Sequence, residues 1–87
     1  MNIEVRRSFE KDADKLPAPF QRQLAAIISQ MEKAGHPADL ENCKKLTGFK
    51  NAFRIRMGHY RIGFYYGNNI AELVRILHRK EIYRYFP

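Results

Sequence analysis

The stretch AFRIRMGHYRIGFYY, residues 52–66, decides the fold of this chain, because apolar and basic side chains alternate along most of it. Alternation with a period of two is typical of a β-strand with one buried face. It runs from Ala52 to Met57, stops at a tight Gly58–His59 connection and resumes at Tyr60. The stretch therefore predicts two antiparallel strands. Their apolar face carries Phe53, Ile55, Met57, Ile62 and Phe64.

A third strand, Ile70–His78, is predicted to complete an antiparallel meander. Its turn is Gly67–Asn69, since glycine and asparagine tolerate the positive φ angles of tight hairpins. Uninterrupted alternation places Val74 and Ile76 on the inward face. The opposite face is then mixed and holds Leu73, Arg75, Leu77 and Arg79.

The first half of the chain predicts one strand and two helices. Met1–Arg7 alternates like a short strand, after which Ser8 is expected to cap a helix that ends near Pro17. A second helix runs to Gly35 with an apolar stripe at helical spacing, and residues 36–51 are expected to be irregular. The stripe consists of Phe20, Leu24, Ile27, Ile28 and Met31.

This order predicts one α+β domain over residues 1–87: an N-terminal strand, a two-helix hairpin and a three-stranded antiparallel meander that forms one sheet. We expect the sheet to pack by one face on the helices. Cys43 is the only cysteine, which excludes an intramolecular disulfide and suits a reducing cytosol. With no long apolar run and no metal-ligand spacing, we expect a cytoplasmic protein without a membrane, metal or cofactor requirement.

Positive charge is concentrated in the second half of the chain. Residues 1–43 hold six lysines and arginines against seven acidic residues, whereas residues 44–87 hold ten against two. A bias of this kind is an electrostatic signature of phosphate binding, although a solvated basic surface is the plain alternative. The residues expected to contact RNA are Lys44, Lys45, Lys50, Lys80 and Tyr60.

Arginines are expected to cluster on the outer face of the predicted sheet. Arg54 and Arg56 project together from one strand, Arg61 stands beside them on the next, and Arg79 follows the third. Guanidinium groups so close together repel one another, and an anion such as a phosphate would relieve this repulsion through paired hydrogen bonds.

Three motifs occur in order at this end of the chain: KLTG at 45–48, FRIRMGHYRI at 53–62 and HRKEIYR at 78–84. They resemble the leucine–glycine turn, the aromatic–basic–aliphatic–basic strand with its glycine–x–tyrosine–arginine turn, and the closing His-Arg-x-x-x-Tyr of the RelE/ParE superfamily. The resemblance covers nearly the whole chain and is closest to the RelE-like mRNA interferases of toxin–antitoxin systems.

The resemblance implies a RelE-like fold with a short C-terminal helix and a small acidic antitoxin as partner, with room for higher-order toxin–antitoxin assembly. RelE-like members cut mRNA in the ribosomal A site without a metal, using the 2′-OH of the RNA as nucleophile. Carried over to this chain, the arginines would bind the phosphate and Tyr83 would stack on the nucleotide to be cut. The arginines that match are Arg54, Arg56, Arg61 and Arg79.

The chain departs from the best-known RelE pattern in one respect, because Arg54 and Arg56 stand where that pattern has lysines. Arginine does not give up its proton, so the general base is not evident. His78, Lys80 and His59 are candidates, and histidine suits the role because it titrates near neutral pH. Related toxins use a histidine near the C-terminus, although strand alternation puts His78 opposite to Arg79.

Three functions remain open at this point. A ribosome-dependent, metal-independent endoribonuclease leads, a ParE-like inhibitor of DNA gyrase is second, and a non-catalytic RNA-binding module is third. The first two share a fold, so the fold alone does not separate them.

Overall fold

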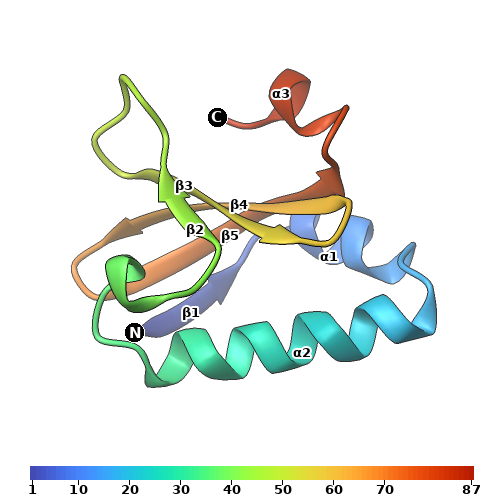
Figure 1. Cartoon of the computed structure of the whole chain (residues 1–87), viewed down its shortest axis with the longest axis horizontal. Helices are drawn as coiled ribbons and strands as arrows, with labels where there is room; N and C mark the ends of the chain where they lie inside the picture. The colour runs from blue at the N-terminus through green and yellow to red at the C-terminus, as the bar shows by residue number, and fades with distance from the viewer.

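A computed structural model describes all 87 residues and confirms the α+β class. Two helices cover one face of a sheet, and a short C-terminal helix lies over the other face (Figure 1). The elements are β1 (Asn2–Val5), α1 (Arg7–Asp14), α2 (Ala18–Lys33), a 3-10 turn η1 (Pro37–Asp39), β2 (Cys43–Lys45), β3 (Ala52–Met57), β4 (Tyr60–Gly67), β5 (Ile70–His78) and α3 (Ile82–Tyr85).

The sheet has five strands in the order β1-β5-β4-β3-β2, so the expected three-stranded antiparallel sheet is wrong in extent and direction. The meander β3-β4-β5 is antiparallel as predicted, but β1 adds to β5 in parallel. Strand β2 adds to β3 within the stretch 36–51 that was expected to be irregular. Three residues, two of them lysines, are too few to show an alternating pattern, and only pairing with β3 makes them a strand.

The main core lies between the sheet and the two long helices. The stripe of α2 faces it as predicted, with Leu24 and Met31 buried and the other members partly buried against the core. Alternation in β3 and β4 also holds here, since Ile55 and Ile62 are 3% and 0% exposed. The buried residues of this cluster are Met1, Phe9, Leu16, Leu24, Met31, Phe53, Ile55, Met57, Ile62, Phe64, Ala71, Leu73 and Ile76.

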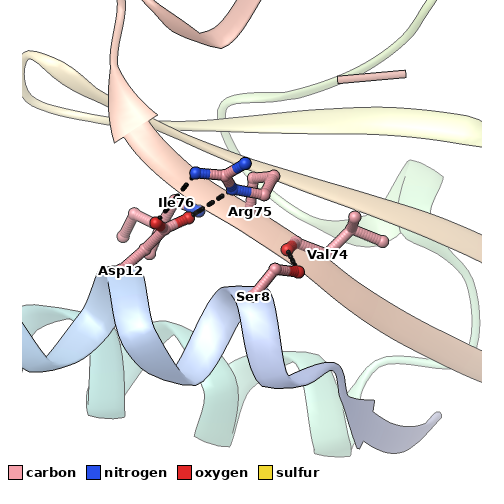
Figure 2. A network of polar contacts seen from close by, with 5 residues as sticks. All are labelled: Ser8, Asp12, Val74, Arg75 and Ile76. Carbon is pink, nitrogen blue, oxygen red and sulfur yellow. Dashed lines mark hydrogen bonds and ion pairs between the residues drawn. The ribbon is translucent and has the colours of Figure 1, made fainter. Parts of the chain in front are cut away.

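Polar side chains of helix α1 contact β5, and one of them is the serine that was expected to cap the helix. Ser8 was expected to cap this helix, but Arg6 is the N-cap residue and makes no side-chain cap bond. The Ser8 hydroxyl instead donates to the Val74 carbonyl at 2.6 Å (Figure 2). One turn later, buried Asp12 accepts two bonds from the Arg75 guanidinium and one from the Ile76 N–H. A serine that contacts the neighbouring strand is not available to its own helix.

A bulge in β5 overturns the expected direction of Val74. Gly63 pairs with Arg75 while the next residue of β4, Phe64, pairs with Leu73, so Val74 is an extra residue in β5. A single extra residue reverses the alternation beyond it. Leu73, expected on the outer face, therefore joins Ile76 in the main core, and Val74 turns to the opposite face.

A smaller second core lies on this opposite face, between the sheet and α3. It consists of Leu46, Ala52, Val74, Ile82 and Phe86.

The β4–β5 turn has positive φ at Asn68 (52°) and Asn69 (62°), which confirms the hairpin predicted there. None of the helices has the length and apolar character that crossing a membrane requires.

Candidate functional site

The four arginines singled out in the sequence stand on the outer sheet face or directly after it, and we call them the arginine cluster. Alternation in β3 turns Arg54 and Arg56 away from the main core, and Arg56 stands directly opposite Arg61 on β4. Arg79 follows the last residue of β5, and its N–H donates to the His59 carbonyl at 2.7 Å.

The charges in this cluster act on one another. The pKa of Arg61 is lowered from its ordinary value, first by partial burial and then by the positive charges of Arg56, Arg79 and Arg54. Like charges disfavour the charged form of their neighbours when they lie close together. Arginine still stays protonated at any physiological pH, so the cluster is a concentrated positive field.

Neutral groups, and no carboxylate, hold two of these cations, Arg61 and Arg56, in place. Nη1 of Arg61 donates to the carbonyls of Gly58 and Tyr60, each at 2.9 Å. Nη2 of Arg56 donates to Oδ1 of Asn42 at 3.0 Å. Both ion pairs of the chain lie outside the cluster. The guanidinium groups of Arg61 and Arg56 are therefore oriented without being neutralised, which leaves them able to bind an anion.

A hollow of about 440 Å³ opens over Arg54, Arg56 and Arg61, and we call it the arginine hollow. Arg79 does not line it. Tyr83, from α3, forms one wall of it and is 73% exposed. The Arg54 guanidinium carbon lies 4.8 Å from the centre of the Tyr83 ring, a cation–π contact. The arginine hollow is lined by Asn42, Cys43, Lys44, Arg54, Arg56, Arg61 and Tyr83.

Cys43 and Asn42 are two lining residues that the sequence did not single out for the site. Burial raises the pKa of the Cys43 thiol to about 11, so it stays protonated near neutral pH and is a poor nucleophile. Asn42 has a left-handed backbone with φ of 59°, which asparagine tolerates. Its residue type was therefore the only feature of the sequence that could have indicated a turn at this position. Both residues come to the site through the pairing of β2 with β3.

His78 lines a different hollow, together with Asp12 of α1 and Tyr85 of α3. Its ring stacks on that of His59 with centroids 6.0 Å apart, and its Nδ1 accepts from the Lys80 N–H at 3.2 Å. None of the three candidate bases lines the arginine hollow. A catalytic role for His78 stays a prediction.

The residues expected to bind RNA are spread over several places. Lys44 lines the arginine hollow, whereas Lys45 and Lys50 line another hollow beside Phe53. Lys80 is exposed beyond β5, and Tyr60 is partly buried. No three His, Cys, Asp or Glu side chains lie close enough together to hold a metal ion.

Comparison with known proteins places this chain in a family. Residues 3–83 match the family described as ParE toxin of type II toxin–antitoxin system, parDE. The chain therefore belongs to the RelE/ParE superfamily of toxins, and it is a RelE-like toxin of a toxin–antitoxin system.

Particular relatives agree over almost the full length. Toxin RelE3 of Methanocaldococcus jannaschii is 35% identical over an alignment of 88 positions that covers 100% of both chains. The crystal structure of the RelB–RelE complex from Methanococcus jannaschii superposes with a TM-score of 0.82 at 33% identity, covering 97% of this chain and 99% of that one. The RelE–RelB complex of Pyrococcus horikoshii shares the fold, with a TM-score of 0.74, 18% identity and coverage of 90% and 93%.

Proposed function

We propose that this toxin is a ribosome-dependent endoribonuclease that cuts mRNA by attack of the RNA 2′-OH on the adjacent phosphate, without a metal ion. The observation that carries the proposal is the arginine cluster, which has no carboxylate partner and lies beside an exposed tyrosine. The residues assigned to the site are Arg54, Arg56, Arg61, Arg79 and Tyr83, with His78 as a candidate base.

The arginines would stabilise the charge that develops at the phosphorus. An in-line displacement passes through a transition state in which the phosphoryl oxygens carry extra negative charge. Fixed donors aimed at such charge lower a barrier by about 3–4 kcal/mol each. Arg61 is the best fixed of the four, because two backbone carbonyls orient it. We therefore assign the phosphate clamp to Arg61, with Arg56 beside it and Arg79 completing the field.

Tyr83 would hold the nucleotide to be cut. Its ring already rests on a guanidinium group and remains mostly exposed, which leaves surface for a splayed base. Stacking would fix the ribose so that its 2′-OH lies in line with the leaving oxygen, and positioning of this kind is a large part of catalysis. As the 2′ oxygen bonds to phosphorus, its proton passes to His78, Lys80, His59 or a group of the ribosome. The bond from phosphorus to the 5′ oxygen breaks, and that oxygen takes a proton from water to become the 5′-OH.

The partner in this proposal is a small acidic antitoxin. The related toxins of M. jannaschii and P. horikoshii were crystallised in complexes with RelB antitoxins. A protein of net charge +7 attracts an acidic partner, and complementary charge speeds such an encounter. Co-purification from native cells, followed by mass spectrometry, would identify it.

The decisive experiment is mRNA cleavage on assembled ribosomes, mapped by primer extension. We expect fragments ending in a 2′,3′-cyclic phosphate and a 5′-OH, and an mRNA with a 2′-deoxy nucleotide at the cut position should stay intact. A gyrase supercoiling assay runs beside it, because the matching family carries the ParE name and because arginine replaces lysine in β3. Inhibition of gyrase without cleavage would overturn the proposal in favour of a ParE-like inhibitor.

A further inference from the structure

A second hollow, of about 390 Å³, adjoins the arginine hollow on the outer face of the sheet. The two hollows share Lys44, Arg54 and Tyr83, so the stacked Arg54–Tyr83 pair is a wall between them. A chain-like ligand that leaves the arginine hollow past this pair would enter the second hollow. The remaining residues of the second hollow are Leu46, Thr47, Phe49, Phe86 and Pro87.

Phe49 is the unusual member of this second hollow. Its side chain is 48% exposed and belongs to neither core, although exposure of a phenylalanine forfeits the stabilisation that burial would give. The turn that carries it is nevertheless anchored, since Leu46 is buried in the second core and accepts a bond from the Phe49 N–H at 3.3 Å. The turn therefore holds the Phe49 ring at the second hollow, where it is open to a ligand.

The chemistry of the second hollow fits a nucleotide. Phe49 offers an aromatic ring for a planar base, and Lys44 and Arg54 offer cations for a phosphate. No aspartate or glutamate lines the second hollow, so nothing there repels an anion. Aromatic rings set among cations along a continuous groove are the usual means of holding single-stranded RNA.

We propose that the second hollow is a base-binding subsite for the nucleotide next to the one that is cut. Phe49 is its stacking platform, and Lys44 and Arg54 bind a backbone phosphate beside it, while Arg61 keeps the phosphate that is attacked. The position of the cut rests on the proposed function. The subsite itself requires only that the ligand is single-stranded RNA.

The test uses the absence of tryptophan from this chain. In Phe49→Trp, the introduced indole is the only strong fluorophore of its kind, and we expect a short RNA with a 2′-deoxy nucleotide at the cut position to quench it by stacking. Phe49→Leu keeps an apolar side chain but no ring, and it should bind this RNA roughly ten- to a hundredfold more weakly, the scale of one lost base stack. Phe49→Trp should bind as tightly as the wild type.

Two controls make the effect specific. Tyr85→Leu removes another exposed aromatic, one that rests on Arg75 and does not line the second hollow, and it should leave the affinity unchanged. An RNA with an abasic ribose at the adjacent position should bind wild type and Phe49→Leu equally. The abasic ribose is also moved along the RNA, one position at a time. If Phe49→Leu binds every one of these RNAs more weakly than the wild type does, the Phe49 ring does not stack on a base.

The remaining outcomes of these measurements each support or overturn the base-binding subsite. Equal affinity of wild type and Phe49→Leu for RNA, or no quenching of the indole, overturns the subsite even if wild type cuts mRNA. Loss of antitoxin binding in Phe49→Leu, with RNA binding intact, overturns it in favour of a protein-docking surface. Phe49-dependent RNA binding in a protein that cuts no mRNA upholds the subsite and overturns the proposed function.

Discussion

The ring of Phe86 lies directly over Gly63, so that a Cβ added at Gly63 would stand 2.5 Å from both Cγ and Cδ2 of the ring. Glycine inside a strand commonly marks such a close approach. Phe86 is 2% exposed and follows α3, while Arg54 pairs with Gly63 across the sheet. The contact therefore anchors α3 next to Arg54, which is where Tyr83 makes its cation–π contact.

Gly63→Ala should weaken this anchor. The methyl group meets a buried ring, and overpacking of this kind costs about 1–3 kcal/mol of unfolding free energy. Cleavage should also fall, since displacement of α3 moves Tyr83. Gly67→Ala is the matched control, because a Cβ at Gly67 meets nothing within 4 Å. Denaturant unfolding of both variants checks the prediction, and equal stability of the two would contradict it.

Arg61→Ala should abolish most cleavage while leaving the protein folded. Loss of one fixed donor to a developing charge slows a reaction by about a hundred- to a thousandfold. The unfolding free energy should stay the same or rise slightly, because the substitution removes the burial and the repulsion that lower the pKa of Arg61. Arg22→Ala on the exposed side of α2 is the control for a lost positive charge. Cleavage by Arg61→Ala at the rate of that control would remove Arg61 from the site.

The sequence predicted those elements whose pattern is local. The stripe from Phe20 to Met31 and the alternation from Ala52 to Met57 each repeat often enough to identify an element, and both match the structure. The pair Asn68–Asn69 identifies its turn by residue type alone. The alternation from Ala52 to Met57 also predicts that Arg54 and Arg56 share one face of the sheet.

The features that the sequence did not reveal depend on pairing between distant segments. Strand β2 is a strand only beside β3, and the parallel pairing of β1 with β5 joins residues far apart in the chain. The extra residue Val74 leaves the apolar pattern of β5 unbroken, so the bulge had no signal. Asn42 and Phe49 belong to the site region through these pairings, and neither lies in a periodic pattern.

Asp12→Asn should be strongly destabilising. Asp12 is 7% exposed and accepts three hydrogen bonds, two of them from Arg75. Removing the charge leaves the Arg75 guanidinium partly buried without a counterion, at a cost of about 3 kcal/mol, the low end for a buried pair. Glu72→Gln breaks the more exposed pair with Arg6 and should cost less than about 1 kcal/mol. Urea unfolding of both variants checks the prediction. If they lose similar amounts of unfolding free energy, burial does not determine how much an ion pair stabilises this protein.

Cys43 should react slowly with alkylating reagents in the folded protein. Its pKa is raised from 9.0 to about 11 by burial, so at pH 8 the thiolate fraction is roughly a hundredfold lower than in the unfolded chain. The raised pKa also makes stability depend on pH, because the folded state favours the protonated thiol. The contribution of this thiol to the unfolding free energy is complete below pH 9 and is lost as pH rises toward about 11. Cys43→Ala should show a smaller loss across that range. Iodoacetamide rates with and without urea check the prediction, and equal rates would contradict it.

His78→Gln should leave most of the cleavage rate intact, because His78 lines a hollow with Asp12 and Tyr85 and not the arginine hollow. Glutamine is similar in size, so the stacking with His59 is the main contact at risk. A histidine that acted as general base would contribute about a hundredfold or more to the rate. It would also make the rate rise between about pH 6 and 7, and that rise would flatten in the variant. Single-turnover cleavage on ribosomes across this pH range separates the two cases. A hundredfold fall with loss of the pH dependence would establish His78 as the base, and it would require β5 to turn this side chain toward the RNA when the ribosome is bound.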